Sequence, residues 1–81
     1  MDVPQTVAGL VDAWCERRCL KALRWILTGW PMASGLTDDW AALQDALNAA
    51  RAYAHDELTP DEEASLDELV RAVDELVHRL L

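Results

Sequence analysis

Cysteine and histidine are the side chains of this sequence best suited to binding a metal, and there are two of each. Cys15 and Cys19 stand four residues apart, so on a helix both project from the same face. Two thiolates facing one way can bind zinc, but a closed tetrahedral site needs two more ligands. In an up-down-up arrangement of helices, His78 lies more than about 10 Å along the axis from the cysteines, which leaves His55 alone as a third ligand. We therefore expect no metal site and interpret both cysteines as small buried apolar groups.

Nucleophilic or acid-base catalysis has little support in the sequence. Ser34 and Ser65 have no basic neighbour, and both histidines fall near the expected ends of helices, where a cation is favoured. The three glycines are scattered, so there is no glycine-rich loop to hold a phosphate. We expect a protein that is not an enzyme and that uses no cofactor.

Charge is divided unevenly along the chain. Residues 1–30 carry four basic and three acidic residues, whereas residues 31–81 carry three basic and twelve acidic ones, for a net charge of −8. The four basic residues of the first part are Arg17, Arg18, Lys21 and Arg24. Such a cluster could contact phosphates, but the net charge repels a polyanion at long range, so we expect no nucleic-acid partner. We expect these cations to face the acidic helices of the same chain or of a second copy.

The same stretch contains the residue types that are enriched where proteins meet, namely Arg, Trp and Met. The predicted partner-binding residues are Arg17, Lys21, Arg24, Trp25, Trp30 and Met32. A different hypothesis is that Trp25 and Trp40 close the open end of a helical bundle. On that hypothesis the tryptophans belong to the core or line a ligand cavity.

The clearest element that positions these residues is a helix at the end of the chain. Thr59 can cap it, Pro60 fits the first helical position, and Glu62 completes a capping box. Apolar residues then recur every three or four positions: Leu66, Leu69, Val73, Leu76 and Leu80. The opposite face carries the acid-first pairs Asp67–Arg71 and Glu75–Arg79. The sequence predicts a helix over 60–81 that buries the apolar stripe.

A second helix is predicted over 37–57. Thr37 can cap it, and Asp38 and Asp39 place negative charge in its first turn, where the backbone amides favour it. Only about two residues separate its end from the helix 60–81. The two helices should therefore form an antiparallel hairpin.

The first helix is predicted over 4–29, followed by a connection marked by Trp30-Pro31 and Ser34-Gly35. Its polar face rotates by roughly 120° to 140° near residue 17. The rotation indicates a bend, a break, or two packing surfaces on one helix. No Pro or Gly marks the change, so we favour one continuous helix with two packing surfaces.

These elements predict a single all-α domain over residues 1–81, a three-helix bundle that assembles as a homodimer because its apolar faces exceed one small core. We expect a small acidic protein-interaction module, an adaptor or regulatory subunit. Two alternatives remain open: a ligand-binding or enzymatic bundle with a Trp-lined cavity near Cys15, Cys19 and His55, and an acidic mimic of DNA. With no membrane span or secretory signal evident, we expect a cytoplasmic protein without a membrane partner.

Overall fold

Helices account for all the regular secondary structure in the part of the chain that is described. The computed structural model describes residues 2–32 and 37–80, in which there are four α-helices, one short 3-10 helix and no strand. They are α1 (Val3–Glu16), α2 (Leu20–Ile26), α3 (Thr37–Tyr53), the 3-10 helix η1 (His55–Glu57) and α4 (Pro60–Leu80). The predicted all-α class is confirmed for these residues.

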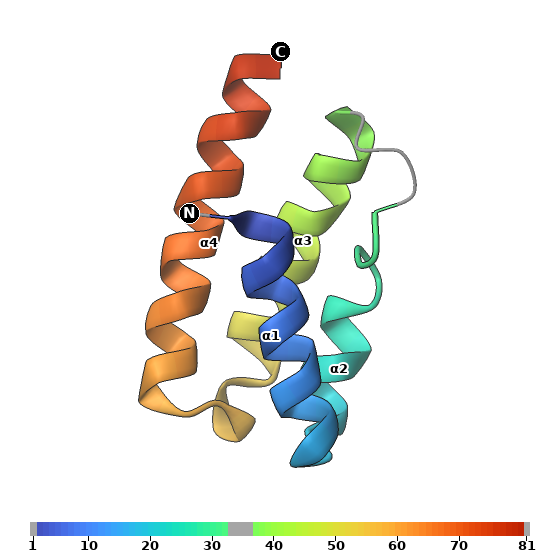
Figure 1. Ribbon diagram of the computed structural model, residues 1–81, viewed down its shortest axis with the longest axis vertical. Coiled ribbons are helices and arrows are strands. Elements are labelled where there is room, and N and C mark those ends of the chain that lie inside the picture. The colour runs from blue at the N-terminus through green and yellow to red at the C-terminus, as the bar shows by residue number, and fades with distance from the viewer. Residues whose placement is uncertain (1, 33–36, 81) are drawn as a thin grey trace.

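Successive helices run in opposite directions, and each packs against its neighbours (Figure 1). α1 contacts α2 and α4, while α3 contacts α2 and α4, so the four helices enclose one core. The molecule measures 35 × 22 × 21 Å. Within the described residues, no helix is long and apolar enough to cross a membrane.

The prediction of one continuous helix over 4–29 is wrong. α1 ends at Glu16, the chain reverses, and α2 runs back beside α1 (Figure 1). Arg18 adopts a left-handed conformation with φ of 54°. The amides of Arg18 and Cys19 donate to the carbonyls of Cys15 and Trp14 at 3.2 and 2.8 Å, which completes a Schellman motif. This motif usually has Gly where Arg18 stands, so the sequence lacks the ordinary stop signal.

The reversal solves a packing conflict. α1 buries Val3, Val7, Leu10 and Trp14, and α2 buries Ala22 and Ile26. On a continuous helix the second group would face roughly 80° to 120° away from Trp14. Folding back turns both faces toward the same core, at the point where the polar face rotates.

The second half of the chain follows its predicted start signals closely. Thr59 and Glu62 form the expected reciprocal capping box, with hydrogen bonds of 3.0 Å to Glu62 Oε1 and 3.2 Å to Thr59 Oγ1. α3 begins at Thr37 as predicted, but it ends at Tyr53, and η1 replaces its last turn. The expected connection at Ser34-Gly35 and the final helical residue, 81, lie outside the described residues.

Two details of packing bear on stability. Gly29, just after α2, lies so close to α3 that an added Cβ would come within 2.4 Å of the Ala42 carbonyl oxygen. On α4 the predicted pair Glu75–Arg79 forms at 2.7 Å. The predicted partner of Arg71 is taken by another helix, because Asp67 pairs with Arg51 of α3 at 2.7 Å.

Candidate functional site

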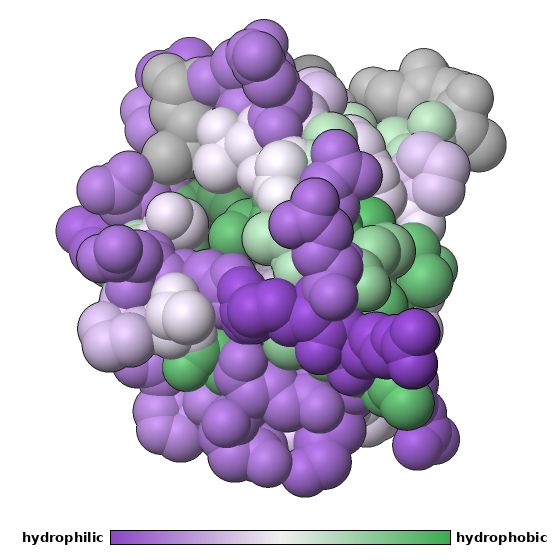
Figure 2. Space-filling view, turned by 60° about the horizontal axis from the view of Figure 1, so that its bottom comes forward, coloured by the Kyte–Doolittle hydropathy of each residue, from purple (hydrophilic) through white to green (hydrophobic). Residues whose placement is uncertain are grey.

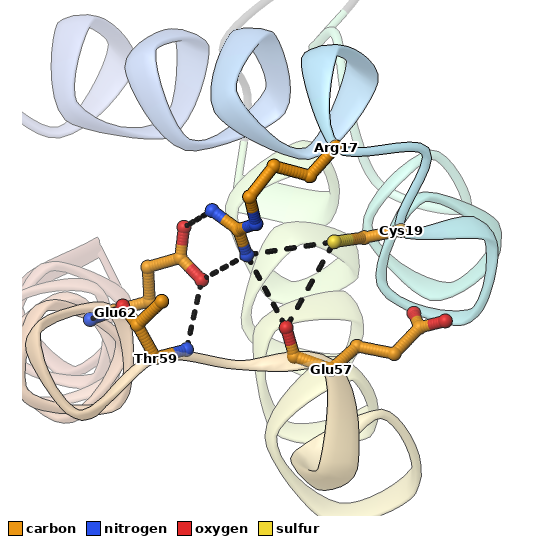
Figure 3. A network of polar contacts seen from close by, with 5 residues as sticks. All are labelled: Arg17, Cys19, Glu57, Thr59 and Glu62. Carbon is orange, nitrogen blue, oxygen red and sulfur yellow. Dashed lines mark hydrogen bonds and ion pairs between the residues drawn. The ribbon is translucent and has the colours of Figure 1, made fainter.

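A polar network fills the place where the break between α1 and α2 meets the connection between α3 and α4. Arg17 donates two hydrogen bonds to Glu62, at 2.6 and 2.7 Å, and a third to the carbonyl oxygen of Glu57 at 3.2 Å (Figure 3). Its Nη2 also lies 3.4 Å from the Cys19 sulfur. We call this set the junction: Arg17, Cys19, Glu57, Thr59 and Glu62. It joins segments about 40 residues apart in the sequence.

Glu62 is the most protected carboxylate of the junction. Its side chain is 10% exposed, whereas that of Arg17 is 40% exposed. The bidentate hydrogen bond from Arg17 lowers the pKa of Glu62 to about 2, against the opposing effect of burial, with help from the Thr59 amide. The same contact raises the pKa of the Arg17 guanidinium. The fully buried indole N–H of Trp14 makes no hydrogen bond of standard geometry among these residues, but it lies near enough to help lower the Glu62 pKa.

The short helix η1 secures the beginning of α2. The Glu57 carboxylate accepts a hydrogen bond of 2.9 Å from the Ala22 amide, in the first turn of α2. Helix amides at this position lack a partner within the helix, so Glu57 acts as a cap supplied from elsewhere in the chain. Beside it, Lys21 pairs with Asp56 at 2.8 Å, which raises the pKa of Lys21 and lowers that of Asp56.

These contacts account for part of the charge asymmetry. Arg17 pairs with Glu62 in the first turn of α4, and Lys21 pairs with Asp56 of η1, so both cations meet acids of the same chain, as we expected for this stretch. Figure 2 turns the lower end of Figure 1 forward and shows strongly hydrophilic residues directly beside hydrophobic ones. The junction therefore holds two parts of the same chain together, and most of its polar groups form hydrogen bonds with each other.

The opposite side of α2 has a different character. The described residues include three large hydrophobic side chains that are exposed, and all lie on or against α2: Leu20 (72% exposed), Leu27 (53%) and Tyr53 (65%). Arg24 lies between the two leucines in sequence, and its guanidinium carbon is 5.4 Å from the centroid of the Trp25 ring. The Trp25 ring packs against Tyr53 with 5.0 Å between centroids. Leu20, Arg24 and Leu27 lie within about 60° of one another around the helix axis, whereas Trp25, with Tyr53 against it, lies about 140° to 160° from the leucines. We call the first set the outer face of α2: Leu20, Arg24 and Leu27.

The predicted partner-binding residues therefore divide into three groups. Arg17 lies at the junction and Lys21 beside it, whereas Arg24 lies on the outer face of α2 with Trp25 next to it. Trp30 and Met32, which follow α2, are partly buried against the core. As a binding surface, all six residues remain a prediction.

Sequence reasoning missed Leu20, Leu27 and Tyr53. A signal was available for the leucines, because they stand seven residues apart with Arg24 between them and so share one helix face. Which face of α2 is exposed depends on the reversal at Arg18, and the sequence did not reveal that reversal. For Tyr53 no local pattern distinguishes an exposed ring from a buried one.

The cysteines and histidines do not converge on one place. Cys19 is buried at the junction, but Cys15 is exposed, which corrects the expectation that both are buried. His55 is exposed and pairs with Glu63, while His78 pairs with Asp74 on its own helix at 3.6 Å. Across residues 2–32 and 37–80 there is no group of three or more ligands able to hold a metal ion, and no pocket.

Comparison of the chain with protein-family models, with curated proteins and with solved structures finds no match. The site must therefore be interpreted from its own geometry.

Proposed function

We propose that this protein is a small, non-enzymatic protein-interaction module, an adaptor or regulatory subunit, that binds its partner through the outer face of α2. One observation carries the proposal: two of the three exposed large hydrophobic side chains among the described residues, Leu20 and Leu27, share this face. Scattered apolar residues are normal on a protein surface, whereas a group of leucines with aromatic and arginine neighbours is typical of an interface.

The distribution of charge supports the same surface. Arg17 is engaged at the junction and Lys21 pairs with Asp56, but Arg18 and Arg24 form no ion pair with any described residue. In the sequence, Arg18 precedes the two exposed leucines and Arg24 lies between them. Arginine at the edge of an apolar patch adds specificity and steers the approach of a partner.

The experiment compares complexes captured from the native host by the wild-type protein and by a double variant, Leu20→Ser with Leu27→Ser. Because both side chains are exposed, the double variant should keep its helical content and its melting temperature. We expect it to lose a specific partner that the wild-type protein retains. A matched control, Ala42→Ser with Ala52→Ser, changes two exposed alanines of α3 and should retain the partner. Equal capture by all three proteins would contradict the proposal.

A homodimer remains our proposal for the state of the protein in the absence of a partner. Its support is the exposed apolar surface just described, which a second copy would also bury. Light scattering across micromolar concentrations tests it, since a mass near 9.1 kDa throughout would rule it out.

A further inference from the structure

The leucines of α2 have the spacing of residues that pack against a second helix, and we call this row the seam. Leu20, Leu23 and Leu27 follow the a, d, a spacing of a heptad, and Leu23 is already half-buried against the core. Arg24 then occupies the e position, which in paired helices contacts the g position of the partner. Leu20 and Leu27 are about 10 Å apart along the axis, two turns of a facing helix.

We infer that the occupant of this seam is an acidic amphipathic helix of another protein. The inference rests on the proposed function and names the class of its partner. Leucine or similar side chains of that helix would cover Leu20 and Leu27, and a carboxylate at its g position would meet Arg24. Arg18, immediately before the seam, is exposed and forms no ion pair with any described residue, so it provides a second cation for the same helix.

The charges around the seam favour this occupant over a second copy. A symmetric antiparallel pair of α2 helices would bring Arg24 of one copy near Arg24 of the other, and like charges facing each other cost free energy. The net charge of −8 does not oppose a short acidic helix as it opposes a long polyanion. At physiological ionic strength, charges beyond about 8 Å are largely screened, so the nearby arginines dominate.

The buried side of α2 explains how such a short helix can present a fixed surface. In the first turn of α2, the Ala22 amide donates to the Glu57 carboxylate at 2.9 Å, and the adjacent Lys21 pairs with Asp56 at 2.8 Å. Its inner face buries Ala22 and Ile26. The seam is therefore ordered before a partner binds, and binding loses little conformational entropy by ordering it.

The test uses three stapled helical peptides with leucine at every a and d position and with Glu, Gln or Lys at every e and g position. Binding to isotope-labelled protein is followed by amide chemical shifts at physiological ionic strength. We expect the Glu peptide to bind about three- to tenfold more tightly than the Gln peptide, because one or two exposed ion pairs are gained. The largest shifts should fall on α2.

Variants assign the preference to a residue. Arg24→Gln should remove most of the difference between the Glu and Gln peptides, whereas Arg24→Lys should keep most of it. Arg71→Gln removes an exposed arginine of α4 that pairs with no described residue, and it should leave the difference unchanged. These three proteins are compared only after their melting temperatures are shown to match.

Three kinds of result would overturn the inference. Equal binding of the Glu and Gln peptides, or tightest binding of the Lys peptide, would show an apolar seam without a preference for acid and would leave the proposed function intact. Concentration-dependent shifts on α2 in the protein alone that persist in excess Glu peptide would identify a second copy as the occupant. If no peptide binds to α2, the partner class is wrong, and the host capture experiment then decides separately whether the interaction module is wrong too.

Discussion

Arg17 and Glu62 stand 45 positions apart in the sequence, yet the Arg17 guanidinium donates two hydrogen bonds to the Glu62 carboxylate. Glu62 also completes the capping box of α4, so the contact joins the break after α1 to the first turn of the last helix. One ion pair thus links the reversal of the chain to the start of α4.

The ion pair can be measured separately from the cap. Glu62→Gln keeps a side chain that can complete the capping box but removes the charge, and we expect it to lower the free energy of unfolding by about 1 to 2 kcal/mol. The value is modest because Arg17 is 40% exposed and so partly screened. A double-mutant cycle with Arg17→Met, followed by urea unfolding, should give a clear coupling. The same cycle at the exposed pair Glu75–Arg79 is the control; a coupling there as large as at Arg17–Glu62 would refute the assigned role.

The stabilisation by Glu62 should depend on pH in a defined direction. Its pKa is lowered from 4.5 to about 2 in the folded protein, so the unfolded chain takes up the proton first as pH falls. The effect of Glu62→Gln should therefore be complete above pH 4.5 and shrink steadily toward pH 2. Urea unfolding of both proteins across this range measures it. An effect that stayed constant down to pH 2 would mean that Glu62 is not held ionised by Arg17.

The left-handed residue at the break predicts a stabilising substitution. Arg18→Gly should raise the free energy of unfolding by about 0.5 to 1 kcal/mol, because Gly adopts the conformation of φ 54° without steric cost. Arg71→Gly makes the same replacement on an exposed turn of α4, where it should lower stability by about 0.5 to 1 kcal/mol. If both variants lose stability equally, the chain is not reversed at Arg18.

Two glycines should respond in opposite ways to one added methyl group. Gly29→Ala pushes a Cβ against the backbone of α3 and should cost about 1 to 3 kcal/mol. Gly9→Ala meets nothing within 4 Å on the exposed side of α1 and should gain about 0.5 to 1 kcal/mol from helix propensity. Thermal unfolding of both variants compares them. A tolerated Gly29→Ala would show that α2 and α3 are less closely packed than described.

Local signals explain which parts of the fold could be predicted. The starts of α3 and α4 were predictable because both follow local signals that act within one turn: Thr37 with the acids after it, and the capping box of Thr59 and Glu62. The reversal after α1 was not, since an arginine occupies the glycine position of the motif and the groups that hold it come from η1 and α4. Only the rotation of the polar face near residue 17 pointed to it.

The candidate site was predictable to a similar degree. Arg24 and Trp25 were singled out by residue type, and the structure places them side by side. Arg17 and Lys21 were singled out by residue type as well, but the acids that pair with them lie at least 35 positions away in the sequence. Exposure of Leu20 and Leu27 is a property of the folded chain, and no composition argument separates them from core leucines.

The most direct test of the account is photo-crosslinking in the native host, with a benzophenone amino acid placed at Leu20, Leu27, Asp12 or Glu68 in turn. All four positions are exposed, but only the first two belong to the outer face of α2. We predict a specific adduct with another protein from Leu20 and Leu27, and little or none from Asp12 and Glu68. Adducts that form equally at all four positions, or only at the last two, would contradict the claim that this protein acts through the outer face of α2.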